Sequence, residues 1–418
     1  MDTRAGKTLR GLIHVKSCSC QDCNASNNIL EANSLSRREF TLAFAGAVLT
    51  MLYDVKSAIA SPPQEVEKPE LTIGFIPITC ATPLFTASIN KFFDKYGLKV
   101  KLRKFSGWAE IRDAFISGEI DGAHLLAPLP IALSLGVSGN PIPTRLVAMQ
   151  NINGQAITLS SKYRGKVKGP QDLKGMVLAV PFDFSMHNFL LRHYLASAGV
   201  DPNKDVQIRV MRPPDMVAAL AAGNIDGYLA PDPFNQRAVH EGVGFIHILS
   251  KELWNGHPCC SFAVKEDFSK KFPNTYRALQ LSFVEAAQYV RKNRQAIVKD
   301  VSAREYLNQP EQVVSAVLTG NFDDGRGGKH SIPDRIDFDP YPWKSFAVWI
   351  LSQMSRWNYV KFLGDPKKLA DAIYDTEGVR KAMAQLGLKA PSSDYKTERI
   401  MGKTFDVKDF ERWKQGRI

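Results

Sequence analysis

Two similar stretches decide the fold: GEIDGAHLLAP at residues 118–128 and GNIDGYLAPDP at residues 223–233. They share the pattern G-x-I-D-G and start 105 residues apart (223 minus 118). In each, a glycine ends a helical pattern, an aspartate lies in the turn, and an apolar strand pattern begins. A strand pattern and a helix pattern also precede both copies. The repetition therefore predicts two similar halves facing a cleft, although a shared local turn is the alternative.

Outward from these stretches, strand and helix patterns alternate. Strand patterns occupy residues 71–76, 98–103 and 206–210, and helical spacing covers residues 83–96 and 215–222. This order is typical of α/β layers around a largely parallel sheet. Beyond residue 262 the spacing becomes helical, over residues 275–293, 310–318, 342–359 and 365–386. Residues 394–418 are polar, and we expect them to wrap the surface.

Composition excludes several classes of protein. The chain has 418 residues, 44% hydrophobic and 23% charged, which is an ordinary globular mixture. Fibrous, collagenous and wholly disordered chains are thereby excluded. The net charge of +12 (54 Lys+Arg minus 42 Asp+Glu) favours anionic partners. The basic residues are scattered, however, so we expect no nucleic-acid partner.

The N-terminal segment has the order of an export signal. Ser36-Arg37-Arg38-Glu39-Phe40 precedes the apolar residues 41–53, and Ala58-Ile59-Ala60 gives a small-residue cleavage pattern. The paired arginines are typical of twin-arginine signals. Residues 1–60 are therefore predicted to direct the protein to the periplasm by the twin-arginine route. A membrane-anchoring helix is the alternative, and the role of Cys18, Cys20 and Cys23 within this segment stays open.

Seven motifs carry a resemblance to a known family. They are GFIPITCATPL at 74–84, FFDKYGLKV at 92–100, SGWAEIRD at 106–113, NINGQAI at 151–157, DGYLAPDPFNQRAV at 226–239, LWNGHP at 253–258 and DYKTERIMGKTFD at 394–406. Together they resemble the nitrate- and bicarbonate-binding components of ATP-driven importers of the cyanobacterial type. The resemblance runs from about residue 71 to residue 406.

The resemblance implies a two-lobed periplasmic-binding-protein fold. Each lobe would be a mainly parallel sheet flanked by helices, with hinge crossings and a helical C-terminal part. The expected segments are an export signal (1–60), a linker (61–69), lobe 1 (70–152 and 250–390), lobe 2 (153–249) and a C-terminal tail (391–418). The resemblance implies a monomeric binding protein, not an enzyme and without a cofactor. It would capture a small anionic solute and pass it to an ABC permease in the inner membrane.

Three residues match ligand positions of that family. Trp108 resembles the tryptophan that packs on the bound anion, and an indole N–H is only a donor. Gln155 resembles the hinge-side amide donor, and His187 matches a ligand histidine of nitrate binders. Each has a structural alternative: Trp108 as a core residue, Gln155 as a bond to the crossing backbone, and His187 as a cap or surface residue. We interpret His124 and His193 as structural.

The chain departs from the family at Cys259-Cys260. The family has a Glu-Lys pair there in nitrate binders, and an acidic residue that binds with calcium in bicarbonate binders. The resemblance places Cys80 on the loop after the first strand and the cysteine pair on the return crossing, so the three are predicted to meet at the cleft. A disulfide from Cys80, a soft-metal site with His187 or His257 nearby, or thiols lining a pocket for a less charged solute remain open.

Two other functions fit parts of the sequence. A cysteine-dependent enzyme on the same fold, cleaving sulfinates or making the thiamine pyrimidine, could use Cys80 as nucleophile and His187 as base. The export signal argues against the biosynthetic enzymes, whose cofactors are cytoplasmic. An anion sensor that reports to a regulator is the second alternative.

Overall fold

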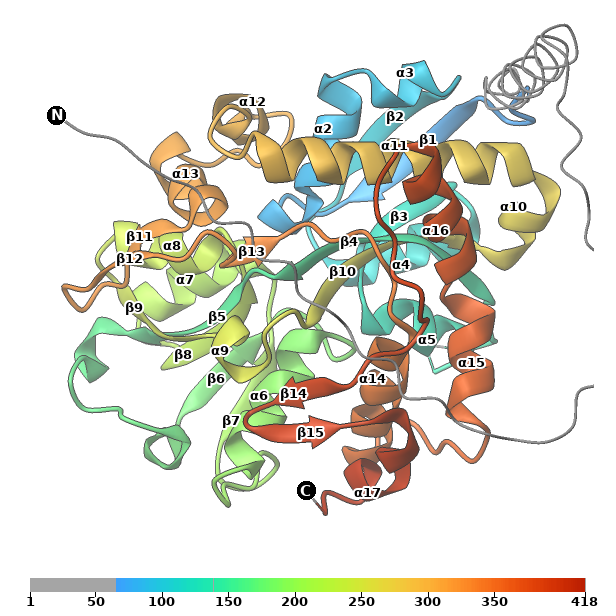
Figure 1. The fold of residues 1–418 in the computed structure, drawn as a ribbon. Helices are drawn as coiled ribbons and strands as arrows, with labels where there is room; N and C mark the ends of the chain where they lie inside the picture. The colour runs from blue at the N-terminus through green and yellow to red at the C-terminus, as the bar shows by residue number, and fades with distance from the viewer. Residues whose placement is uncertain (1–64, 138, 418) are drawn as a thin grey trace, which may run out of the picture. The chain divides into compact units, whose positions relative to one another are not determined.

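Two mixed β-sheets organise the protein (Figure 1), whose computed structural model describes residues 65–137 and 139–417. The first sheet has the order β13-β4-β10-β3-β1-β2 and the second β7-β6-β8-β5-β9. The strands of the first are β1 (Glu70–Phe75), β2 (Lys99–Lys104), β3 (Gly122–Leu126), β4 (Thr144–Asn153), β10 (Pro258–Lys265) and β13 (Ile336–Asp337). Those of the second are β5 (Gln155–Ser160), β6 (Val177–Val180), β7 (Gln207–Val210), β8 (Gly227–Pro231) and β9 (Gly244–Leu249).

The two sheets repeat one pattern. The order β2-β1-β3-β10-β4 in the first matches β7-β6-β8-β5-β9 in the second: two parallel pairings are followed by two antiparallel ones. The α/β class and the two similar halves are thus confirmed. In each sheet one strand, β10 in the first and β5 in the second, runs antiparallel to both of its neighbours, because it follows a crossing from the other half. The sheets are therefore mixed, with four strands of each running in one direction.

Helices cover both sheets. They are α2 (Thr82–Ile89), α3 (Phe92–Lys95), α4 (Trp108–Ser117), α5 (Pro128–Ser134), α6 (Met186–Ala196), α7 (Pro213–Ala221), α8 (Phe234–His240), α9 (Ser250–Leu253), α10 (Glu266–Lys271), α11 (Pro273–Lys292), α12 (Val298–Ser302), α13 (Glu311–Thr319), α14 (Lys344–Arg356), α15 (Pro366–Ile373), α16 (Thr376–Gln385) and α17 (Phe410–Lys414). The helix predicted over 83–96 is two helices, because Lys91 takes a left-handed conformation (φ 59°). The prediction over 365–386 also splits, where Asp375 caps α16.

The aspartate of each G-x-I-D-G copy bonds to a matching strand, β1 in the first half and β6 in the second. The Oδ2 atom of Asp121 accepts the backbone N–H of Thr72 at 2.8 Å, and that of Asp226 accepts the N–H of Val177 at 2.9 Å. Each aspartate also donates its own N–H to the carbonyl of the same partner, at 2.8 Å in both halves. The repeat therefore extends from the letters to the hydrogen bonds.

Three chain segments cross between the sheets, and Asn153 ties them together. Asn153 accepts the N–H of Gly256 at 2.8 Å and donates to the carbonyl of Asp334 at 3.1 Å. Gly154, with φ +80°, donates its N–H to the carbonyl of Arg335 at 2.9 Å. A Cβ at Gly154 would lie 2.8 Å from the Ile336 side chain, so the close approach requires glycine. The third crossing, near residue 335, was not predicted from the sequence.

The remaining elements extend these sheets. The hairpin β11 (Asn321–Asp323) and β12 (Lys329–Ser331) joins the second half, where the carbonyl of Asp324 accepts the N–H of Ile246 at 2.8 Å. The chain end forms a hairpin, β14 (Glu398–Ile400) and β15 (Lys403–Phe405), followed by α17. Phe405 and Trp413 are fully buried there, so this segment packs into the core instead of wrapping the surface.

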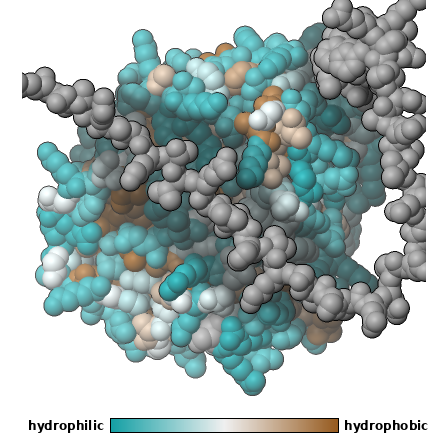
Figure 2. Space-filling model, in the orientation of Figure 1, coloured by the Kyte–Doolittle hydropathy of each residue, from teal (hydrophilic) through white to brown (hydrophobic). Residues whose placement is uncertain are grey.

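The predicted lobe limits stay a prediction. The strands of the second sheet lie within 153–249, and those of the first lie outside that range except at Asn153, the end of β4. The predicted export signal, with Arg37 and Arg38, lies outside the described residues. Within the described residues, no helix is both long enough and apolar enough to span a membrane. The face shown in Figure 2 is mainly hydrophilic, with apolar side chains in small groups.

Candidate ligand site

Three buried thiols converge where the two halves meet. Cys80 lies in a short 3-10 helix, η1 (Thr79–Ala81), that follows β1, and Cys259 and Cys260 lie at the start of β10. The Sγ atoms of Cys80 and Cys259 are 3.5 Å apart, and those of Cys259 and Cys260 are 3.7 Å apart. All three sulfur atoms lie within 4.8 Å of one another. The predicted meeting of the three cysteines is therefore seen in the structure, with all three as free thiols rather than in a disulfide.

The cysteine pair was expected on the return crossing, but it lies on the central strand β10. The carbonyl of Cys259 accepts the N–H of Ala127 at 2.9 Å, which continues the pairing of β10 with β3. The N–H of Cys260 is donated to the side chain of Asn151 at 3.1 Å, where the pairing of β10 with β4 is irregular. Buried strand neighbours thus hold both cysteine backbones in place.

Burial and mutual hydrogen bonding shift the pKa values of the three thiols in different directions. Burial raises the pKa of Cys80 and of Cys260 well above the ordinary thiol value. Burial acts on Cys259 in the same sense, but hydrogen bonds from the Cys260 and Cys80 thiols outweigh it and hold the Cys259 pKa well below its usual range. The cluster therefore favours one thiolate at its middle member, hydrogen-bonded by two thiols.

The three predicted ligand residues are buried and lack partners. Trp108 is the first residue of α4, Gln155 the first residue of β5, and His187 the second residue of α6. Within the described residues, the Trp108 Nε1, both amide atoms of Gln155 and both ring nitrogens of His187 have no hydrogen-bond partner. Leaving a buried polar group unpaired costs about 1–3 kcal/mol. Buried polar groups without a partner are uncommon and call for an explanation, of which a bound ligand is one.

Two of these residues adjoin the thiols. His187 and Gln155 are both close enough to Cys259 to contribute to lowering its pKa. Burial lowers the pKa of His187 to about 4, so its imidazole is neutral at pH 7. Trp108 also lies near the junction of the halves. The preceding residue, Gly107, is so close to the second half that an added Cβ would lie 3.3 Å from the Arg212 side chain.

Two further histidines near the thiols differ in their hydrogen bonding. His257 bonds the carbonyl of Pro258 at 2.9 Å through Nδ1 and the hydroxyl of Ser250 at 2.8 Å through Nε2, so both its ring nitrogens are engaged. His124, interpreted as structural, is fully buried in β3 with neither ring nitrogen partnered. Burial lowers its pKa to about 4, and the charge of Cys259 acts against this shift. The repeat already marked His124 as unusual, because the matching position of the second copy is the apolar Leu229.

An ion pair lies next to this cluster. Thr79 donates both its N–H and its hydroxyl to the carbonyl of Asp232, at 3.0 and 2.8 Å. The carboxylate of Asp232 accepts two bonds from Arg335, at 2.9 and 3.1 Å, and both side chains are fully buried. Burial raises the pKa of Asp232, and Arg335 opposes that rise. The second half is thus bonded both to the loop that carries Cys80 and to the third crossing.

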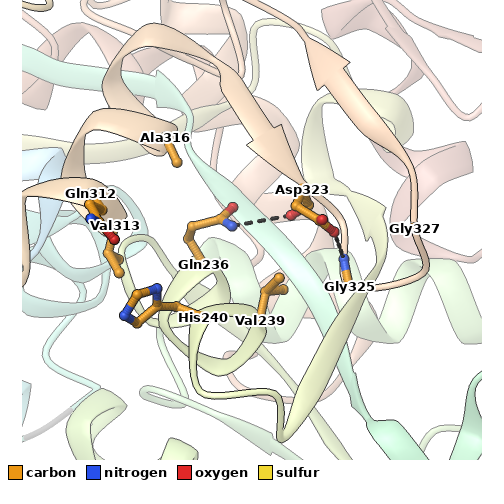
Figure 3. Close-up of a pocket in the computed structure, with 9 residues that line it drawn as sticks. All are labelled: Gln236, Val239, His240, Gln312, Val313, Ala316, Asp323, Gly325 and Gly327. Atoms are coloured by element: carbon orange, nitrogen blue, oxygen red, sulfur yellow. Dashed lines mark hydrogen bonds between the residues drawn. The ribbon is translucent and has the colours of Figure 1, made fainter.

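A surface pocket of about 370 Å³ lies beyond this ion pair. Arg335 also donates to the side chain of Gln236 at 2.6 Å, and Gln236 donates to the carbonyl of Asp323 at 3.1 Å. Figure 3 shows Gln236 pointing toward Asp323, with Val239 and His240 of the same helix nearby. None of the thiols or predicted ligand residues lines this pocket.

The comparison with known proteins places these features in a family. The profile of the NMT1-like family matches residues 64–303, more than half of the chain. The chain belongs to the NMT1-like family. This NMT1-like protein is 29% identical to the nitrate/nitrite binding protein NrtA of Nostoc over 380 residues, 85% of each chain. It is 27% identical to the bicarbonate-binding protein CmpA of Synechococcus, over 82% of this chain and 84% of CmpA.

Another relative is longer. The nitrate import ATP-binding protein NrtC of Synechocystis is 34% identical over 329 residues, and this match spans 74% of the present chain but only 48% of NrtC. The chain thus spans about half of that relative. It contains no G-x-x-x-x-G-K-[ST] nucleotide-binding sequence.

A solved structure has the same fold over most of its length. The periplasmic nitrate-binding protein NrtA from Synechocystis matches with a TM-score of 0.80 and 27% identity, over 84% of this chain and 99% of that one. The expected periplasmic-binding-protein fold is therefore confirmed for this NMT1-like protein. NrtA and CmpA, matched over most of their lengths, are named as binding proteins rather than enzymes.

Proposed function

We propose that this chain is the periplasmic binding component of an ABC importer for a small anionic solute of the nitrate, nitrite or bicarbonate class. It would take the solute between its two halves and deliver it, as a monomer, to a permease in the inner membrane. The observation that carries the proposal is the set of buried, unpartnered donors of Trp108, Gln155 and His187 at the junction of the halves. The names of the relatives support the class of solute.

The donors favour binding through hydrogen bonds rather than through a full positive charge. The Trp108 N–H and the Gln155 amide each donate without carrying a charge, and His187 is neutral at pH 7. The nearby guanidinium of Arg335 is already committed to Asp232. A small oxyanion in this water-excluded place would accept several short bonds at once, which is how such sites obtain selectivity.

Access to the site requires the halves to separate. Trp108, Gln155 and His187 are at most 1% exposed, so the described state is closed around them. The bonds between Thr79 and the carbonyl of Asp232 join the halves directly and would break on opening. A solute that pairs the donors stabilises the closed state by its differential affinity for it.

Calorimetry with nitrate, nitrite and bicarbonate tests this proposal. We expect one of these anions to bind, and Trp108→Phe and Gln155→Leu each to weaken it about 10- to 150-fold, since a bond to a charged group contributes roughly 1.5–3 kcal/mol. Trp349→Phe is the matched control, because the Trp349 N–H is also buried and unpartnered but lies on α14 against Trp254. Absence of binding by all three anions, or affinities within twofold of the parent for both variants, would contradict the proposal.

Export by the twin-arginine route is a separate part of the proposal. Replacing Arg37 and Arg38 together with lysine should leave the precursor inside the cell, because that route reads the arginine pair. Cell fractionation with N-terminal sequencing of the exported protein measures this, and a start at or near Ser61 is expected. Unchanged export of the lysine variant would refute the twin-arginine route while leaving the binding proposal intact.

A further inference from the structure

We propose that Cys80, Cys259 and Cys260 bind one soft cation of the Cu(I) class through their three sulfur atoms. The proposal concerns the thiol cluster alone and does not depend on which anion, if any, the cleft captures. It rests on the spacing of the sulfur atoms, on the way their backbones are held, and on the unpartnered imidazoles around them.

The spacing of the thiols fits ligands of a single ion. A metal with bonds of about 2.3 Å to sulfur separates its thiolates by about 3.8–4.0 Å in tetrahedral or trigonal geometry. The Cys80–Cys259 and Cys259–Cys260 sulfur separations, 3.5 and 3.7 Å, are close to this, and the third pair lies within 4.8 Å. An ion at the centre would therefore need only small side-chain adjustments.

Neighbouring residues fix the backbones of the three cysteines by hydrogen bonds, as supporting residues commonly do for metal ligands. Strand pairing fixes Cys259 through Ala127, and the Asn151 side chain fixes the N–H of Cys260. Cys80 is placed by Thr79, whose two bonds to Asp232 anchor η1. The three sulfur atoms thus come from two separate chain segments that are each anchored independently.

The number of ligands favours Cu(I) over Zn²⁺. Structural zinc takes four ligands, whereas a monovalent d¹⁰ ion is stable with three thiolates. No His, Asp or Glu of the described residues joins the three cysteines within the 4.8 Å spacing, and both ring nitrogens of His257 are engaged. Thiolates are the ligands that soft ions prefer.

Simple packing of thiols as small apolar groups leaves part of the site unexplained. The imidazole of His187 acts electrostatically on Cys259, and so does that of His124, yet none of their ring nitrogens has a partner within the described residues. A Cu(I) ion bound by three thiolates has a net negative charge, so its sulfur atoms would offer acceptors to the single N–H of each neutral ring. Apolar thiols would give them none.

The test is a Cu(I) titration of the full chain in which Cys18, Cys20 and Cys23 are replaced by serine, so that only the cluster thiols remain. Cu(I) is added without oxygen as its acetonitrile complex, in competition with the chelator bicinchoninate. One Cu(I) per chain is expected, and X-ray absorption should show three sulfur neighbours. Cys80→Ser and Cys259→Ser should each weaken Cu(I) binding by more than roughly 100-fold, since even groups that only support ligands contribute 10- to 100-fold.

Ser261→Ala is the matched control, because it changes a buried side chain of the same strand next to the cluster without removing a thiol. It should bind Cu(I) as the parent does. Thermal melting of each variant shows whether it is folded, and a folded cysteine variant with parental Cu(I) affinity would overturn the proposal. So would a single free thiol in the protein isolated without oxygen, which means a disulfide, or preference for Zn²⁺ over Cu(I) in direct competition.

Discussion

The two halves of this protein share a framework and differ in chemistry. Asp121 and Asp226 make the same pair of bonds to matching strands, β1 and β6. The tenth position of each repeat differs: Ala127 in the first copy and Asp232 in the second. Both donate a backbone N–H to a crossing segment, Ala127 to Cys259 and Asp232 to Gly154. The backbone role is thus common to both, and only the second copy adds a charge there.

The candidate ligand residues also differ between the halves although the backbone around them is shared. The segments after the matching strands β1 and β6 supply Cys80 in one half and His187 in the other, and β3 has His124 where β8 has Leu229. Duplicated turns and strands position both sets at the ends of parallel strands, where ligands of α/β proteins bind. What differs between the halves is therefore a better guide to chemistry than what they share.

Removing the partner of Asp232 should have the largest effect. Arg335→Met leaves a fully buried carboxylate without its guanidinium, which typically costs about 3–5 kcal/mol. Urea unfolding measures this loss, and the double variant with Asp232→Leu should recover much of it. Arg291→Met is the control, because Asp337 keeps its bond to Arg294 and the Arg291 side chain is 40% exposed. A loss below about 1 kcal/mol for Arg335→Met would mean that the charge at this position does not distinguish the halves energetically.

Much of the fold was predictable because it rests on local and repeated signals. The G-x-I-D-G copies indicated two halves, since glycine ends a helix and aspartate occupies a turn for reasons of backbone geometry. Long apolar spacing placed α11 within two residues at its N-terminal end, at Pro273 against a predicted 275. The break at Lys91 carried no comparable local signal, because lysine rarely takes a left-handed conformation. The third crossing carried none either, because Arg335 is placed by bonds to the distant Gly154 and Asp232.

The candidate site was predictable only in part. The resemblance proposed Trp108, Gln155 and His187 as ligand residues, and in the structure the polar side-chain atoms of each are buried and unpartnered among the described residues. The resemblance brought Cys80 near Cys259 but put the cysteine pair on the return crossing, whereas in the structure β10 already begins at Pro258. His257 looked available, and only three-dimensional contacts show that Ser250 and its own neighbour occupy it.

The C-terminal hairpin, which has no counterpart in either half, should contribute a pH-dependent stability. Burial raises the pKa of Glu398 to about 7, against bonds from Trp254, Ser345 and Lys396 that lower it. Between pH 4.5 and about 7 the unfolded chain loses this proton and the folded chain keeps it, so stability falls as pH rises. Glu398→Gln removes that dependence, and its advantage over the parent should grow across this window to about 2–3 kcal/mol.

Urea unfolding of both proteins at several pH values measures the difference. Buried histidines such as His187, with a pKa lowered to about 4, make both proteins less stable as pH falls below about 6.5. That contribution is common to the two proteins and cancels in their difference. A difference that stays constant from pH 4.5 to 7 would show that Glu398 is ionised in the folded state at all these values.

The smallest expected effect tests the shared framework directly. Asp121→Asn and Asp226→Asn each remove a charge that accepts a strand N–H and pairs with a lysine, Lys68 in one half and Lys162 in the other. Because the lysines are partly exposed, each variant should lose only about 1–2 kcal/mol. Asp226 also accepts the hydroxyl of Tyr163 at 2.7 Å, so its loss should be the larger.

Urea unfolding of the two variants and of their double variant decides whether the halves use this aspartate alike. The two aspartates share no hydrogen-bond or ion-pair partner among the described residues, so their losses should add to within about 0.5 kcal/mol. Asp113→Asn, exposed and paired only with the adjacent Arg112, should cost less than about 0.5 kcal/mol. If Asp121→Asn lost no more free energy of unfolding than that control, the bonds of Asp121 and Asp226 would agree in geometry but not in their contribution to stability. The first half would then depend on packing of β1 where the second depends on its turn.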